Sequence, residues 1–109
     1  MNKAYAPSQP ARAEVDALAG PVVVEFGTDW CGHCRAAQPL IQEALADFPA
    51  QRHLKVEDGP GRALGRSFRV KLWPTLIFMA DGREVARLVR PQSVAEIEDA
   101  LRQITGAAS

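Results

Sequence analysis

Cys31 and Cys34 are the only cysteines in the 109-residue chain, and two residues separate them. They come directly after an apolar run, residues 22–26, and before a segment, residues 35–48, whose apolar side chains recur at helical spacing. A cysteine pair at the junction of a strand and a helix is typical of a dithiol that exchanges disulfides. We therefore expect thiol–disulfide chemistry at this point of the chain, with zinc binding as the alternative.

The two cysteines occupy different places on the expected helix. Disulfide exchange needs a thiolate that attacks and a second thiol that resolves the mixed disulfide. Cys31 falls at the helix N-terminus, where unpaired N–H groups and the helix dipole favour an anion, whereas Cys34 lies one turn further in. Cys31 is therefore the expected nucleophile and Cys34 the resolving thiol. We expect His33 to stabilise the Cys31 thiolate by charge or by a hydrogen bond, which makes the disulfide a stronger oxidant.

A structural zinc site is the alternative use of the cysteine pair. Such a site takes a closed set of nitrogen and sulfur ligands, so His33 and His53 would both have to join the cysteines. His53 belongs to a separate expected strand, where we interpret it as a strand or surface histidine without a role. We therefore expect no metal, and no cofactor apart from the redox-active Cys31–Cys34 disulfide.

The elements around the pair alternate between helix and strand. In chain order, the patterns predict a helix from Ser8, a strand over 22–26, a helix over 35–48, a strand over 53–57, a short helix over 62–69, strands over 75–79 and 84–89 joined by an Asp81-Gly82 hairpin, and a helix from Ser93 to Gly106. The two strand–helix–strand connections imply parallel strands, and the hairpin adds an antiparallel one. The fold class is therefore α/β, with a central mixed sheet of about four to five strands and helices on both faces.

The composition limits the partners and the location of the chain. Its 13 basic and 13 acidic residues give no net charge, so nothing indicates a nucleic acid or an anionic membrane as partner. No stretch approaches the roughly 18 apolar residues of a membrane-spanning helix, and the N-terminus lacks the apolar centre of a secretory signal. We therefore expect one monomeric domain over residues 1–109, located in the cytoplasm, with residues 1–7 and 106–109 as flexible ends.

Further motifs surround the cysteines. Trp30 directly precedes them, Pro39 lies inside the following helix, and Trp73-Pro74-Thr75 precedes the strand that enters the Asp81-Gly82 hairpin. With these motifs, the chain resembles the thioredoxin family over residues 22–101. The resemblance implies the thioredoxin fold and a peptide-binding oxidoreductase, in which the bond before Pro74 is cis and faces the dithiol.

Several positions depart from the family pattern. Gly32-His33 stands where thioredoxins usually carry Gly-Pro, and it looks like the version found in protein disulfide isomerase. Gly27 stands where many relatives carry an aromatic residue. Trp73 replaces a small or β-branched residue, and Arg90-Pro91 occupies a region where relatives often carry a glycine. The last two departures would alter the groove that binds the substrate.

The resemblance also implies roles for charged residues near the cysteines. Glu25 matches a buried family carboxylate that relays a proton to or from Cys34, and we expect burial to raise the pKa of Glu25 toward neutral pH. A half-exposed strand glutamate is the alternative interpretation. Lys55 matches a family lysine near that carboxylate, and an ordinary surface lysine is its alternative.

The expected substrate-binding residues are Trp30, Gly32, Trp73, Pro74 and Thr75. The segment 73–75 would form the groove opposite the dithiol, where the backbone of Trp73 pairs with a substrate strand. Trp30 would shield the nucleophile or contact the substrate, with a partly buried loop support as the alternative. Trp73 could equally be a core residue, since indole rings are usually well buried.

Together these residues predict a thiol–disulfide oxidoreductase that acts on proteins through Cys31 and Cys34 and is recharged by a reductase or another electron donor. Two features conflict over direction. The missing signal sequence favours a cytoplasmic disulfide reductase, which is the function we expect, whereas Gly32-His33 favours an oxidase or isomerase. A redox-inactive interaction module on the same fold is the remaining alternative, and the presence of both cysteines argues against it.

Overall fold

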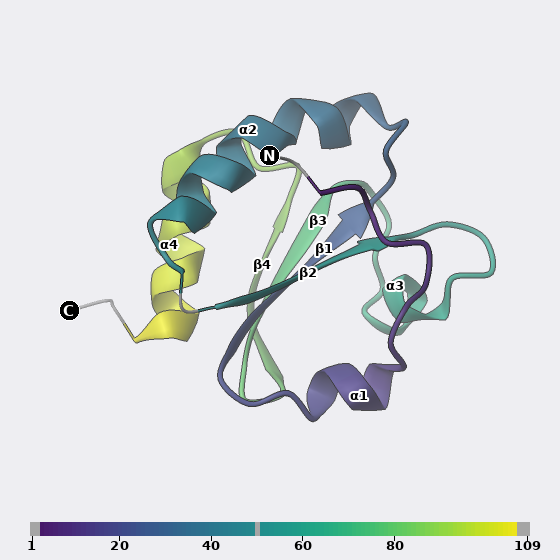
Figure 1. Ribbon diagram of the computed structural model, residues 1–109, viewed down its shortest axis with the longest axis horizontal. Helices are drawn as coiled ribbons and strands as arrows, with labels where there is room; N and C mark the ends of the chain where they lie inside the picture. The colour runs from purple at the N-terminus through teal and green to yellow at the C-terminus, as the bar shows by residue number, and fades with distance from the viewer. Residues whose placement is uncertain (1–2, 50, 107–109) are drawn as a thin grey trace.

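The computed structural model describes residues 3–49 and 51–106. In chain order its elements are α1 (Arg12–Asp16), β1 (Pro21–Gly27), α2 (Gly32–Ala46), β2 (Arg52–Glu57), α3 (Ala63–Ser67), β3 (Thr75–Ala80), β4 (Arg83–Val89) and α4 (Val94–Thr105) (Figure 1). This order of helices and strands is the one that the sequence predicts. Within the described ranges, no helix has the length and apolar character needed to cross a membrane.

The strands form one mixed four-stranded sheet in the order β2-β1-β3-β4. β1 runs parallel to β2 and antiparallel to β3, and β3 pairs antiparallel with β4. The prediction that both strand–helix–strand connections give parallel strands is therefore wrong for β3. The end of β2 and the start of β3 lie at the same end of β1, because Glu57 pairs with Gly27 and Thr75 with Phe26. The five-residue α3, roughly 7.5 Å long, is too short to return the chain along a strand of about 20 Å.

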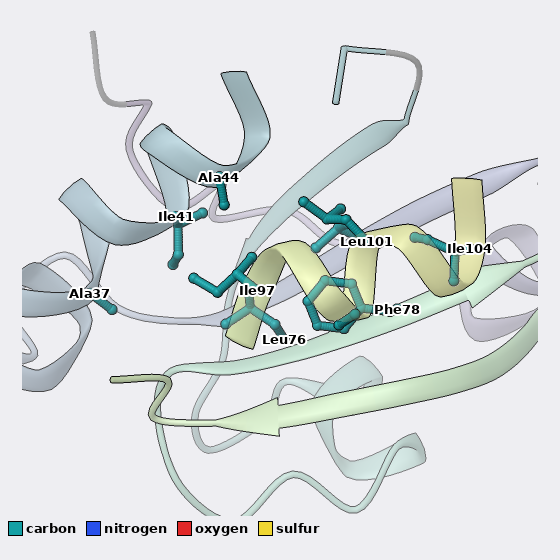
Figure 2. Close-up of a cluster of buried hydrophobic side chains, with 10 residues drawn as sticks. Ala37, Ile41, Ala44, Leu76, Phe78, Ile97, Leu101 and Ile104 are labelled. Carbon is teal, nitrogen blue, oxygen red and sulfur yellow. The ribbon is translucent and has the colours of Figure 1, made fainter. Parts of the chain in front are cut away.

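Helices cover both faces of the sheet, as expected (Figure 1). On one face, α2 and α4 pack over β3, where Ile41 and Leu101 meet Phe78 (Figure 2). On the other face, Val15 of α1 and Leu64 of α3 belong to a second apolar cluster with side chains of β1, β2 and β3. Because both faces are buried, a polar side chain that points out of the centre of β1 lies in the interior.

The first helix begins later than predicted. Its N-cap is Ala11, whose N–H donates to the Glu14 carboxylate at 2.7 Å, and Ser8 is exposed before it. Gln9 explains the shift, because its amide donates to the Glu57 carbonyl at 2.7 Å and accepts from the Leu64 N–H at 3.0 Å. These long-range bonds hold the chain extended where the local pattern favours a helix.

The N-terminal segment packs against the sheet. Tyr5 is only 4% exposed, and its N–H donates to Asp29 Oδ1 at 3.0 Å. Ala6 forms a parallel bridge with Val56 of β2. Tyr5 and Ala6 are thus held against the sheet, and the flexibility expected of residues 1–7 stays a prediction, with residues 1–2 and 107–109 outside the described residues. Gly106 ends α4 in the left-handed conformation with φ 74°, as its position after the helix predicts.

Candidate active site

The cysteine pair lies at the start of α2, just beyond the end of β1. Cys31 is the N-cap residue of α2, and its Sγ accepts a hydrogen bond from the Cys34 N–H at 3.2 Å. Both cysteines are free thiols, 8% and 1% exposed respectively. The N–H groups and dipole of the helix terminus stabilise negative charge on Cys31 Sγ, which is the more accessible of the two sulfurs. His33 is exposed on the first turn of α2.

Cys34 is in a different environment. Burial and a hydrogen bond with Cys31 raise the pKa of its thiol to about 12, against the opposing effect of hydrogen bonds from the Thr28 backbone and the Tyr5 side chain. Cys34 is therefore a neutral thiol at physiological pH. It needs a base before it can act as a nucleophile.

Glu25, on β1, is completely buried below the cysteines. Its carboxylate accepts hydrogen bonds from the Tyr5 hydroxyl and from Gln38 Nε2 at 2.9 Å, and His53 Nε2 lies 2.9 Å from its Oε1. Burial raises the pKa of Glu25, but the hydrogen bonds with His53, Tyr5 and Gln38 outweigh burial, so the pKa lies below its ordinary value. The expected burial is thus observed, and the expected rise in pKa is wrong.

Strand β2 supplies two side chains to this polar network. Lys55 is the register partner of Glu25, but its Nζ donates to Gln38 Oε1 at 2.7 Å, so the amide of Gln38 links the two. His53 lies on β2, as expected, and its ring contacts the carboxylate directly, a contact that was not expected from the sequence. Over residues 3–49 and 51–106, no cluster of three or more potential metal ligands occurs.

The sequence reasoning missed three members of the network. Gln38 follows Cys34 by four residues on one face of α2, a spacing that is visible in the sequence. His53 precedes Lys55 by two residues and therefore shares its face of β2. Tyr5 has no comparable signal, because it reaches the carboxylate only through the pairing of the N-terminal segment with β2.

Two tryptophans border the cysteines. Trp30 is 70% exposed, and its ring meets the Trp73 ring edge-on, with centroids 5.8 Å apart. Trp73 packs against the buried cluster of Tyr5, Cys31 and Cys34, while its indole N–H donates to Asp58 Oδ2 at 2.9 Å. The alternative interpretation of Trp30 as a partly buried support is therefore wrong. The two rings instead contact each other beside the cysteine cluster.

The remaining predicted substrate-binding residues are Gly32, Pro74 and Thr75. The Trp73-Pro74 peptide bond is cis, as the family resemblance implies. Thr75 is buried, and its hydroxyl donates to the Leu72 carbonyl at 2.6 Å. A Cβ at Gly32 would meet no atom within 4 Å, so Gly32 itself faces open space. The Trp73 carbonyl accepts from Arg90 Nε at 2.8 Å, which leaves its second lone pair for a substrate N–H.

One helix terminus thus holds two sulfurs in different environments. Cys31 Sγ accepts a backbone N–H at the start of α2, whereas Cys34 is a buried thiol with a raised pKa. A dithiol needs this difference in order to attack a disulfide with one sulfur and release the product with the other. The fold and the site together define a protein that exchanges disulfides through its own cysteine pair.

Known proteins identify the family. The sequence model described as Thioredoxin matches residues 8–103. Thioredoxin Asp f 28 of Aspergillus fumigatus is 30% identical over 86 residues, which cover 79% of this chain and 80% of the fungal protein. Thioredoxin of Chlamydia pneumoniae is 36% identical over 70 residues, which cover 64% of this chain and 69% of the chlamydial protein.

A solved structure agrees with these sequence matches. The reduced form of thioredoxin 2 from Pseudomonas aeruginosa PAO1 has a TM-score of 0.88 and 62% identity to this chain, covering 98% of this chain and 99% of its own. The chain belongs to the thioredoxin family, and it is a thiol–disulfide oxidoreductase. Thioredoxins act on the disulfides of proteins.

Proposed function

We propose that this chain is a cytoplasmic protein disulfide reductase. The observation that carries this proposal is a neutral, buried Cys34 thiol that packs beside Tyr5, whose hydroxyl donates to an ionised Glu25. A reductase removes a proton from its resolving thiol in every cycle, and Glu25 is ionised and therefore able to take that proton. Its lowered pKa makes it a weak base, so the proton leaves as Cys34 attacks Cys31, not before.

The proposed cycle has two exchange steps. The Cys31 thiolate attacks one sulfur of the substrate disulfide, the S–S bond breaks, and the other substrate sulfur leaves as a thiolate. Cys34 then gives its proton to the base formed by Glu25 and attacks Cys31 Sγ, which releases the second substrate thiolate. The substrate gains two electrons, and the protein keeps a Cys31–Cys34 disulfide.

The substrate groove in this proposal is the surface around Cys31. Trp30 and Trp73 would supply apolar contact, and Gly32 faces open space. The free lone pair of the Trp73 carbonyl would accept an N–H of an extended substrate segment. Pro74 and Thr75 would hold this carbonyl in position. We propose His33 as the residue that tunes the stability of the thiolate, since it follows Cys31 by two residues on the exposed first turn of α2.

We also propose that the chain acts as a single monomeric domain and takes electrons from a reductase or another dithiol donor. The redox centre is the cysteine pair itself, so the cycle needs no further cofactor, only a supply of electrons. A cytoplasm keeps thiols reduced and therefore supports a reductase.

Reduction of insulin by dithiothreitol tests the reductase assignment. The protein should accelerate precipitation of the insulin chains, and it should oxidise a reduced peptide more slowly than it reduces the matching disulfide. Cys34→Ser should accumulate a mixed disulfide with the substrate, whereas the matched variant Cys31→Ser should trap none. Folded protein without turnover would favour a redox-inactive binding module, and faster oxidation than reduction would reverse the proposed direction.

A further inference from the structure

The Tyr5 hydroxyl lies between the resolving thiol and the buried carboxylate. It donates to Glu25 Oε2 and accepts from Gln38 Nε2 at 3.4 Å, and Cys34 Sγ lies beside it next to Gly27. Tyr5 is 4% exposed, and it forms one buried cluster with Cys31 and Cys34. The Tyr5 oxygen therefore lies beside the thiol that must lose a proton and is hydrogen-bonded to the group proposed to receive it.

Gly27 provides the space in which the hydroxyl and the thiol meet. A Cβ at this position would lie 2.6 Å from Cys34 Sγ and 2.7 Å from the Tyr5 hydroxyl oxygen. Real Cβ atoms do not approach other atoms so closely, so any side chain here would displace the hydroxyl or the sulfur. Gly27, which departs from the family pattern, thus leaves the space that the aromatic ring of Tyr5 occupies.

Several contacts hold the tyrosine in this place. The Tyr5 N–H is fixed on Asp29, and the following residue, Ala6, forms a bridge with β2. The ammonium group of Lys55 lies 4.7 Å from the centroid of the Tyr5 ring, where a cation is attracted to the aromatic face. The hydroxyl is therefore positioned before the reaction begins, as a group that transfers protons requires.

We propose that Tyr5 is a catalytic residue that passes the proton of Cys34 to Glu25 during resolution, an inference that rests on the proposed function. The thiol proton moves to the Tyr5 oxygen as the tyrosine's own proton moves to Glu25 Oε2. The Cys34 thiolate forms its bond to Cys31 Sγ, and the bond from Cys31 to the substrate sulfur breaks with its electron pair on the substrate. Tyr5 ends neutral and Glu25 ends protonated, so charge and protons balance.

The surroundings of Tyr5 favour a transfer in which its proton and that of Cys34 move together, because an ionised tyrosine would be unfavourable there. Burial and the neighbouring Glu25 charge raise the pKa of Tyr5 well above its ordinary value. The charged and titratable groups facing the carboxylate are His53 and Lys55 from β2, with Cys34 from α2 beyond the tyrosine. The His53 side chain is 18% exposed and borders a surface hollow of about 360 Å³, so it gives the proton on Glu25 a route to solvent.

Tyr5→Phe tests the relay, because it removes the hydroxyl and keeps the ring beside Gly27. The reduced protein is mixed with dithionitrobenzoate, whose chromophoric thiol is released once when Cys31 attacks and again when Cys34 resolves. The first release should stay within about twofold of the wild-type rate, and the second should slow by roughly tenfold or more. An unchanged second release would overturn the proposal.

Two comparisons separate a relay from a structural role. Thr105→Val removes another partly buried hydroxyl, one that donates to the Leu101 carbonyl at 2.9 Å in α4, and it should leave both releases unchanged. In a Glu25→Gln background, Tyr5→Phe should slow resolution by no more than about twofold, because the relay has already lost its acceptor. A further tenfold loss in that background would mean that Tyr5 acts independently of Glu25, against the proposal.

The wild-type protein provides a test that does not depend on whether Tyr5→Phe folds. The resolution rate, measured across mixtures of light and heavy water, should curve with the deuterium fraction, because two protons move together. A linear dependence would mean one moving proton and would overturn the relay. Absence of the first release would instead contradict Cys31 as the nucleophile, so failure of the proposed function is distinguishable from failure of this inference.

Discussion

The chemistry of this protein depends on the different environments of its two cysteine sulfurs. Cys31 caps α2 and accepts an N–H, whereas Cys34 is buried one turn later and has a pKa of about 12. His33 lies between them on the exposed side of the helix, where its imidazole can stabilise charge on Cys31 without entering the buried network. The reduction potential should therefore respond to His33.

Replacing His33 with proline should lower the reduction potential, because the reduced thiolate loses the stabilising imidazole. The reduction potential should fall from about −180 mV toward about −270 mV, as measured by equilibration with glutathione buffers. His33→Ala is the matched variant and should shift the potential in the same direction. A shift with proline alone would assign the effect to the backbone, and no shift in either variant would contradict the role of His33.

The secondary elements depend on local signals to different degrees. At α4, Ser93 is the N-cap and its Oγ accepts the Glu96 N–H at 3.2 Å, as the predicted capping box requires. The Glu96 carboxylate accepts the Gln92 N–H at 2.9 Å instead of the Ser93 N–H, so the second half of the box is shifted by one residue. At α1, Ser8 carries a similar sequence signal but is not the N-cap. The two serines therefore form a matched pair that tests whether each helix begins at its predicted N-cap.

Ser93→Ala should reduce the free energy of unfolding by about 1 kcal/mol, because the first turn of α4 loses its side-chain acceptor. Ser8→Ala should leave the free energy of unfolding unchanged, since Ala11 caps α1. Urea unfolding followed by circular dichroism measures both variants. Equal losses would restore Ser8 as a helix cap and contradict the observed start of α1.

On the scale of the whole molecule, a charged network lies inside the layered core. Glu25 belongs to an inner strand of a sheet that helices cover on both faces, and its hydrogen-bond partners come from the N-terminal segment, α2 and β2. Because the folded pKa of Glu25 lies below its ordinary value of 4.5, ionised Glu25 adds stability above that pH. This contribution is lost as the pH falls through the lower, folded pKa.

Glu25→Gln should therefore lose less stability on acidification than the wild-type protein does. Urea unfolding at neutral pH and near about pH 3 gives the two differences to compare. Glu84 also has a lowered pKa, through its bond with Arg87, but it is present in both proteins and cancels in the comparison. An equal or larger acid loss in the variant would show that the Glu25 pKa is not lowered in the folded state.

Local patterns were sufficient for much of this protein. The order of the elements and the Asp81-Gly82 hairpin follow from apolar period and turn chemistry, which involve neighbouring residues. The position of Cys31 at a helix N-terminus follows in the same way. The family resemblance added the cis bond before Pro74, which no local pattern specifies.

Only the tertiary structure decided the direction of β3 and the composition of the buried network. Tyr5 and His53 meet Glu25 across 20 and 28 positions of sequence, respectively, so no local pattern contains them. The sign of the Glu25 pKa shift depends on these partners, because burial and hydrogen bonding act in opposite directions and the number of donors decides the balance. The sequence by itself therefore determined where the dithiol lies, and tertiary packing decided which polar groups surround it.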